Sequence, residues 1–155
     1  MDESPVGRSL ETDVLFLVHD LARLMRTRFD QRARRHGMTR AQWGILAKLE
    51  LQSGISQNDL AGLVEVEPIT VCRLIDRLEA RGLVERRSDP RDRRVRRLHL
   101  TPAAEPILDE IHAYREELRE ELTAGIPEAA LKSQVDTLLR MKANLVQQQP
   151  AAQAV

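Results

Sequence analysis

The 155-residue sequence is short of several features, and each shortage excludes a class of protein. The single cysteine, Cys72, cannot form a disulfide within the chain, which favours a reducing compartment. The longest early apolar run, residues 14–18, is broken by His19 and Asp20 and is too short for a signal peptide or a membrane span. We therefore expect a cytoplasmic protein that does not associate with membranes.

Patterns typical of catalytic centres are also missing. The sequence has no glycine-rich phosphate loop and no nucleophile with a general base near it. Its four histidines, at positions 19, 36, 99 and 112, form no recognisable zinc-binding spacing with cysteine or carboxylate residues. We therefore expect no enzymatic activity, no cofactor and no bound metal.

The residue types that are present favour a mainly α-helical fold. Aromatic residues make up only 3% of the chain, whereas leucine, alanine, glutamate and arginine are abundant. The 24 basic and 24 acidic residues cancel, but their distribution is uneven: the net charge is +1 over residues 1–35, +3 over 36–101 and −4 over 102–155. A basic middle segment predicts a polyanionic partner.

Most of this positive charge lies in one stretch, RRSDPRDRRVRRLHL, at residues 86–100. Between positions 86 and 97 it holds seven arginines and two aspartates, an excess of five positive charges. A solvated charged hairpin that binds nothing is the alternative interpretation. The helices that precede the stretch argue against that alternative.

Start and stop signals divide the first half of the chain into four helices. Capping boxes, in which a Ser or Thr and a polar residue three positions later bond each other's backbone amides, start helices at Thr39 and Ser56. Pro68, suited to a first helical turn, starts the fourth helix. Gly37 ends the long amphipathic first helix, and Gly82 ends the fourth. The third and fourth helices are close enough in sequence to form a helix-turn-helix.

The segments after the fourth helix predict a β-hairpin and two long helices. Short apolar stretches at residues 83–84 and 98–100 are typical of two strands joined by the basic loop, which completes a winged helix. Pro102 starts the next helix, and Pro106 predicts that its first turn is irregular. A last helix follows Pro127.

These signals divide the chain into regions. The long first helix and the last two helices carry apolar stripes with no sheet to cover them, so pairing with a second copy of the chain would bury them. We expect a helical dimerisation region at residues 1–35 and 102–148, a winged helix-turn-helix region at 36–101, a frayed segment at 1–12 and a disordered tail at 149–155.

The order of elements resembles the MarR family of bacterial transcriptional regulators across roughly residues 13–147. The segment LVEVEPITVCRLIDRLEARGLVERRSDPRDRRVRRLHLTP is similar to the family's recognition helix, Asp-Pro-x-Asp-Arg-Arg wing and Leu-Thr exit in unbroken order. The resemblance implies a homodimer that binds operator DNA and usually represses transcription until a small molecule or oxidant releases it. Glu65 departs from the pattern, because many such turns have glycine there.

The fourth helix predicts the residues that read DNA. With Val71, Leu74, Ile75 and Leu78 facing the core, the outward row that follows Pro68 is Ile69, Thr70, Arg73 and Arg77. We expect Arg73 to contact a base, Ile69 a thymine methyl group and Arg77 a phosphate. The alternative is that Arg73 and Arg77 only pair with Glu67, Asp76 or Glu79 on a solvated face.

The arginine-rich loop predicts a contact with the minor groove, where the negative potential is enhanced. By resemblance to the family's wing, Arg94 enters the groove and Asp92 braces the loop by pairing with a neighbouring arginine. The remaining wing arginines would contact phosphates: Arg86, Arg91, Arg93, Arg96 and Arg97.

The sequence indicates the effector site less specifically than it indicates the DNA-binding residues. In the family, aromatic acids or their thioesters bind between the dimerisation helices and the winged helix. His19, Arg23 and Arg26 share one side of the first helix, so they and Trp43 could hold an anionic aromatic ligand. The alternative is that Trp43 is a core residue. Cys72 is expected to pack rather than to sense oxidants.

A second class of function stays open at this point. A winged helix can also serve as a protein-docking module without sequence-specific DNA binding, because a fold alone does not fix its use. Steep salt dependence of DNA binding would distinguish a DNA reader from such a module.

Overall fold

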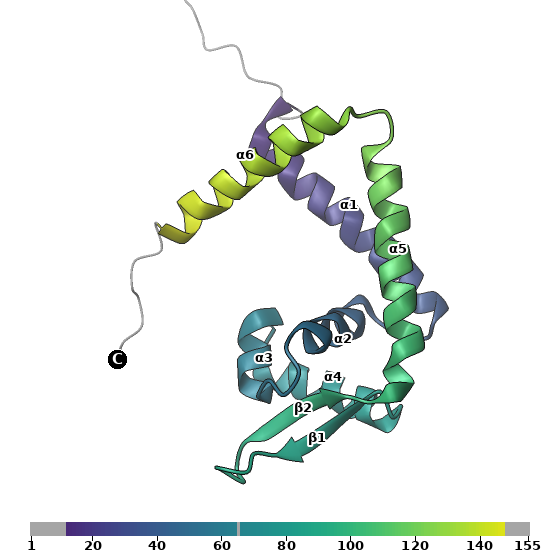
Figure 1. Cartoon of the computed structure of the whole chain (residues 1–155), viewed down its shortest axis with the longest axis vertical. Coiled ribbons are helices and arrows are strands. Elements are labelled where there is room, and N and C mark those ends of the chain that lie inside the picture. The colour runs from purple at the N-terminus through teal and green to yellow at the C-terminus, as the bar shows by residue number, and fades with distance from the viewer. Residues whose placement is uncertain (1–11, 65, 148–155) are drawn as a thin grey trace, which may run out of the picture. The chain divides into compact units, whose positions relative to one another are not determined.

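The computed structural model describes residues 12–64 and 66–147, which form a mainly α-helical chain with one β-hairpin (Figure 1). The chain divides into two compact units, whose described residues are 12–64 and 66–112 in the first and 113–147 in the second. The expected disorder of the tail, nearly all of the expected frayed segment and the turn at Glu65 lie outside the described residues.

The expected order of helices and strands is confirmed. The elements are α1 (Val14–Arg35), α2 (Arg40–Leu51), α3 (Gln57–Val64), α4 (Pro68–Ala80), β1 (Val84–Ser88), β2 (Arg96–Leu100), a short 3-10 helix η2 (Pro102–Ala104), α5 (Glu105–Thr123) and α6 (Glu128–Gln147). Helix α5 crosses from the first compact unit into the second.

Most of the local signals act as the sequence predicts. The Gln42 amide donates to Thr39 Oγ1 (3.2 Å) and the Thr39 amide donates to Gln42 Oε1 (2.9 Å), so both halves of the capping box form. At the start of α3 only half of the expected capping box forms. The Asp59 amide donates to Ser56 Oγ (3.1 Å), but the Asp59 carboxylate accepts from the Ser56 hydroxyl (2.6 Å) and not from its backbone amide. Gly82, directly after the α4 C-cap, has a φ of 70°, a left-handed conformation that favours glycine.

The hydrophobic core of the first unit lies between α2, α3, α4 and the hairpin, which Figure 1 shows gathered together. Its largest fully buried side chains are Ile45, Leu46, Leu49, Leu60, Val71, Ile75, Leu78, Val84 and Leu98. Leu74, which the sequence placed in the core, is only half-buried. This core holds α4 and the hairpin on one rigid base, since close-packed interiors resist deformation.

The hairpin is longer than the sequence predicts. Antiparallel pairing runs from Val84 opposite Leu100 to Ser88 opposite Arg96, and therefore extends through charged residues. Backbone hydrogen bonds form whatever the side chains are, so apolar residues mark only the base of the hairpin. Strand β2 also pairs with the α2–α3 segment: the Leu98 amide donates to the Ile55 carbonyl (3.0 Å), and Leu98 accepts from the Gly54 amide (2.9 Å).

The start of α5 is irregular, as Pro106 predicts. The 3-10 helix η2 precedes α5, and Pro106 is the second residue of α5. Its missing N–H therefore falls in the first turn, where backbone amides have no partner within the helix.

The terminal helices expose many large apolar side chains. In α1 of the first unit these are Val14, Leu15, Phe16, Leu17, Val18, Leu21 and Leu24, and in the second unit Leu122, Ile126, Val135, Leu138, Leu139, Leu145 and Val146. None of the helices in the described part of the chain is long and apolar enough to cross a membrane. The contact-defined unit includes α1 with the winged helix, so the assignment of α1 to dimerisation stays a prediction.

Candidate nucleic-acid interface

Helix α4 has three faces with different chemistry. At 3.6 residues per turn, Val71, Ile75 and Leu78 lie within roughly 60° of one another, and all three are fully buried. A second face carries Cys72, Asp76 and Glu79 toward β1. The remaining face is open: Ile69, Thr70, Arg73 and Arg77 are all exposed, together with Pro68 at the first turn.

Five arginine side chains on α4 and the hairpin tip have no partner among the residues that the structure describes. Within residues 12–64 and 66–147, no hydrogen bond or ion pair holds the guanidinium groups of Arg73, Arg77, Arg91, Arg93 and Arg94. The open face of α4 and the tip thus present positive charge without a compensating acid. The sequence-based alternative was that Arg73 and Arg77 pair with Glu67, Asp76 or Glu79. Asp76 and Glu79 bind Arg86 instead, and among the described residues Glu67 forms no bond with either arginine.

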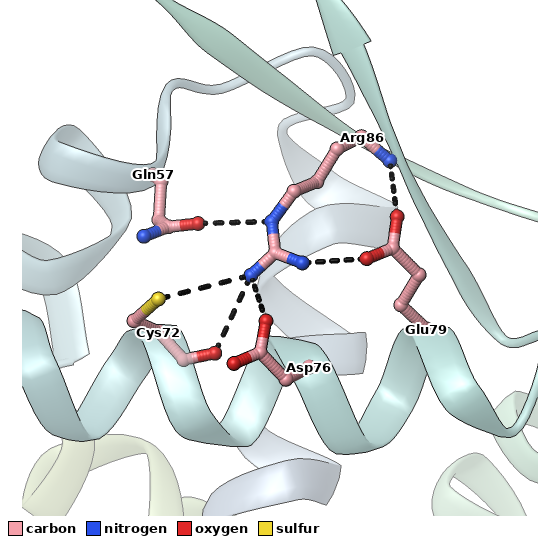
Figure 2. Close-up of polar contacts among 5 residues, drawn as sticks. All are labelled: Gln57, Cys72, Asp76, Glu79 and Arg86. Atoms are coloured by element: carbon pink, nitrogen blue, oxygen red, sulfur yellow. Dashed lines mark hydrogen bonds and ion pairs between the residues drawn. The ribbon is translucent and has the colours of Figure 1, made fainter.

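Arg86 is held by acceptors from two helices (Figure 2). Its guanidinium donates to Glu79 Oε2 (2.5 Å), Asp76 Oδ1 (2.6 Å) and Gln57 Oε1 (3.2 Å), and its Nη2 lies 3.4 Å from the carbonyl oxygen of Cys72. Burial opposes the charge of Arg86, but hydrogen bonds with Asp76 and Glu79 outweigh it and raise the pKa of Arg86 above its usual value. The side chain is only 18% exposed.

Three other hairpin arginines bind acceptors in the hairpin itself or in the segment between α2 and α3. Arg97 pairs with Asp89 and donates to the Gly54 carbonyl (2.8 Å). Arg87 pairs with Glu85, and Arg96 donates to Ser88 Oγ (2.7 Å). Of the side chains expected to contact phosphates, those of Arg86, Arg96 and Arg97 therefore already have protein acceptors.

At the hairpin tip, Asp89 rather than Asp92 pairs with an arginine side chain. Asp89 is 6% exposed and accepts from the Arg91 amide (2.7 Å) and the Arg97 guanidinium. The hydrogen bond from the Arg91 amide, followed by that from Arg97, holds the pKa of Asp89 below its usual value. Asp92 instead accepts from the backbone amide of Arg94 (2.9 Å). The expected pairing of Asp92 with an arginine side chain is wrong, because the tip turns through backbone contacts at Asp92.

A small cavity lies between the start of α3 and the hairpin tip. Its volume is about 190 Å³, and its lining residues are Ser56, Gln57, Asn58, Arg94, Val95 and Arg96. The first backbone amides of a helix and an arginine side chain both favour negative charge. The cavity therefore adds to the positive character of the same surface.

The residues predicted to hold an effector are not brought together. Trp43 is 2% exposed, and its ring centroid lies 5.7 Å from that of His36, at the end of α1. His19 lies 17 residues earlier, roughly 25 Å away along the helix at 1.5 Å per residue. Arg23 pairs with Asp20 (2.5 Å) on the exposed side of α1, and Arg26 is exposed as well. Trp43 is a core residue, as the alternative interpretation has it.

The sequence did not predict that Asp89 and Gln57 help to hold the wing, through their bonds with Arg97 and Arg86. For Asp89 a signal existed, because Asp before Pro commonly accepts from the amide two residues later in a turn. Gln57 carries no such signal, since its contact with Arg86 joins positions 29 residues apart. Among the described residues, no group of His, Cys, Asp or Glu is arranged to hold a metal ion.

Taken together, these features define a winged helix-turn-helix protein whose recognition helix and wing present uncompensated arginines. The sequence model of the MarR family matches residues 38–95. The crystal structure of transcriptional regulator PA3341 is 34% identical, with 85% of this chain and 97% of that chain covered and a TM-score of 0.75. The chain belongs to the MarR family of transcriptional regulators and is not an enzyme.

Two further solved structures agree with this assignment. A crystal structure of MarR is 28% identical, with 95% of each chain covered and a TM-score of 0.76. The S. aureus MepR–DNA complex is 24% identical, with 88% of this chain and 99% of that chain covered and a TM-score of 0.73, and shows the same fold.

Proposed function

We propose that the chain is a homodimeric, sequence-specific DNA-binding regulator, which acts in the cytoplasm as a repressor that a small organic effector releases. The observation that carries DNA binding is the set of five unpaired arginines on the open face of α4 and on the hairpin tip. Arginines that have no acceptor within the described part of the protein are available to bind the phosphates of a polyanion such as DNA.

The open face of α4 suits the major groove. Arg73 lies near the start of the helix, where it can donate two hydrogen bonds to a guanine, and Ile69, which is 62% exposed, can contact a thymine methyl group. Arg77 lies one turn further on and can bind a phosphate. Pro68 and Thr70 complete the end of the helix that enters the groove.

The hairpin tip suits the minor groove. Arg94 extends from a loop whose backbone Asp92 and Asp89 hold in place, so little conformational freedom is lost when Arg94 enters the groove. Arg91 and Arg93 have no protein acceptor in the described part of the chain and can bind flanking phosphates. MepR has the same fold and was crystallised in a complex with DNA, which supports the proposal that this chain binds DNA.

The exposed apolar faces of α1 and of the second unit support dimerisation. Large contiguous apolar surfaces are rare on monomers and mark interfaces. A two-fold dimer would place two recognition helices on one face of a duplex, with half-site centres about 10 bp apart. Residues 12–35 and 102–147 are the described parts of this proposed dimerisation region, and 36–101 is the DNA-binding region.

Repression and release by an effector rest on the family assignment. We expect an anionic, aromatic effector to bind the exposed Arg23 and Arg26 of α1, where it would compete with Asp20 for Arg23, and not to contact Trp43. Loss of effector-induced release in Arg23→Ala, with DNA affinity intact, would support this site, and an unchanged response would exclude it.

The test of DNA binding is selection of duplexes from a random pool by the purified chain, followed by affinity measurements across salt concentrations. If the dimer neutralises about eight phosphates, log K falls with log salt at a slope of about −7, and the selected site contains an inverted repeat. Weak binding to every duplex, with no preferred site, would instead favour a protein-docking module.

A further inference from the structure

Arg86 differs from the unpaired arginines in how its donors are used. Each nitrogen of its guanidinium has an acceptor within the protein, from Gln57 on α3 and from Asp76 and Glu79 on α4 (Figure 2). Its backbone amide also donates to Glu79 Oε1 (3.2 Å). Four of its five N–H donors have acceptors among these residues and the Cys72 carbonyl, and the side chain is 18% exposed, so a phosphate that gripped this guanidinium with two bonds would displace bonds to protein acceptors.

The position of Arg86 makes it a link between three elements. It lies on β1 opposite Leu98, where the hairpin is anchored in the core. Its partners lie on the first helix of the helix-turn-helix and on one face of the recognition helix. A planar group with donors in fixed directions sets the angle between such elements better than apolar contact does.

We infer that Arg86 is a positioning residue, which fixes the wing against the recognition helix, and that Asp76 and Glu79 are therefore needed for tight DNA binding. This inference rests on the proposed function and goes beyond it. It assigns two acidic residues to a site that binds a polyanion, where net charge alone would make them unfavourable.

The test uses charge-neutral variants of near-equal shape, Asp76→Asn and Glu79→Gln, singly and together. The probe is the duplex that the wild-type chain selects from a random pool. If Arg86 positions the wing, the double variant binds this duplex about ten-fold or more weakly. Glu79→Gln leaves one acceptor oxygen for two Arg86 donors, and the remaining bonds are no longer charge-assisted, so the wing is held less firmly. If Arg86 binds phosphate, freeing it and removing two negative charges per protomer would tighten binding and steepen its salt dependence. Unchanged or tighter binding overturns the inference.

Glu85→Gln is the matched control. Glu85 pairs with Arg87, whose side chain is 61% exposed, so this variant removes the same negative charge nearby without touching Arg86. We expect it to bind the duplex as tightly as the wild type or slightly more tightly. An equal loss in Glu85→Gln would show that neutralising any carboxylate on the wing weakens binding, which overturns the inference.

Introducing Asp76→Asn into the Arg94→Ala protein distinguishes a role of Arg86 in positioning the wing from a general loss of structure. In Arg94→Ala the wing has lost its contact in the groove and keeps only the phosphate contacts of Arg91 and Arg93, so the added effect of Asp76→Asn should shrink to about two-fold or less. Full additivity would mean that Asp76 does not act through the wing, and would overturn the inference. Thermal unfolding of each variant establishes that it is folded at the temperature used.

Hydrogen exchange of the free protein gives a readout that needs no DNA. Loss of the Arg86 bonds should speed exchange of the hairpin amides, such as those of Asp89 and Leu98, while the α2 amides keep their wild-type rates. Unchanged hairpin exchange overturns the inference even if DNA binds. If instead the wild-type chain selects no duplex but the exchange result holds, the proposed function fails and the role of Arg86 in placing the wing stands.

Discussion

Replacement of Arg94 by alanine is the most direct test of the wing. Arg94 has no protein acceptor among the residues that the structure describes, and Asp92 holds its backbone amide at 2.9 Å. The substitution therefore removes a side chain without breaking a contact that supports the fold. We expect the stability of the free protein to change by about 0.5 kcal/mol or less, the range for exposed positions.

The expected effect on DNA binding is much larger. An arginine contact in a groove contributes roughly 1–3 kcal/mol, and a dimer loses two such contacts. Each cation also displaces about 0.9 counterions from DNA, so the magnitude of the salt slope should fall by about 2 for the dimer. The change in slope is the more specific quantity, because a loss of affinity alone could come from a misplaced recognition helix.

The assay is fluorescence anisotropy with the selected duplex between about 50 and 200 mM salt, the range over which this slope is commonly read. Arg87→Ala is the matched control, since it removes an arginine from the same hairpin whose guanidinium pairs with Glu85. An Arg94→Ala slope equal to that of the wild type, or equal losses for the two variants, would refute the reasoning that unpaired arginines form the interface.

Three other predictions concern base reading, assembly and acid stability. Arg73→Ala should relax base preference at one position per half-site and weaken binding by roughly 1–3 kcal/mol, as read by repeating the duplex selection. Leu17→Glu, at a 50% exposed position of α1, should shift the chain from dimer to monomer in sedimentation. The hydrogen bond from Arg32 (2.6 Å), aided by the charge and hydrogen bond of His36, holds the pKa of Glu110 below its usual value. The ionised Glu110 therefore stabilises the fold above the unfolded-state pKa of about 4.3, and this stabilisation is lost as the pH falls through the pKa of Glu110 in the folded protein. Glu110→Gln should lower the melting temperature at pH 7 but have little effect near pH 2.

Local signals made most of the fold predictable. The capping box at Thr39, the Ser56 cap, the proline at position 68 and the glycine at 82 act over three or four residues, so no tertiary information is needed to read them. The irregular start of α5 follows from Pro106 for the same reason. The hairpin length did not follow, because strand pairing through Arg87 and Arg97 depends on the backbone of the facing strand.

The roles of the wing residues were harder to predict because the sequence shows charges and not their partners. Seven arginines in twelve residues suggest one phosphate-binding cluster. The structure separates them into Arg91, Arg93 and Arg94, without acceptors in the described residues, and four others that have them. The acceptors of Arg86 lie 7, 10 and 29 positions away, so only the folded chain reveals them.

Helix α4 shows why net charge is a poor guide to this interface. Arg73 and Arg77 balance Asp76 and Glu79, so the helix sums to zero. At 100° per residue, however, the acids fall roughly 60° to 120° around the helix from Arg73, on the side that meets β1. There Arg86, which the hairpin contributes, neutralises them. The open face keeps both of its positive charges because the acids are bound by an arginine from another element, and this arrangement lets a helix of zero net charge face a polyanion.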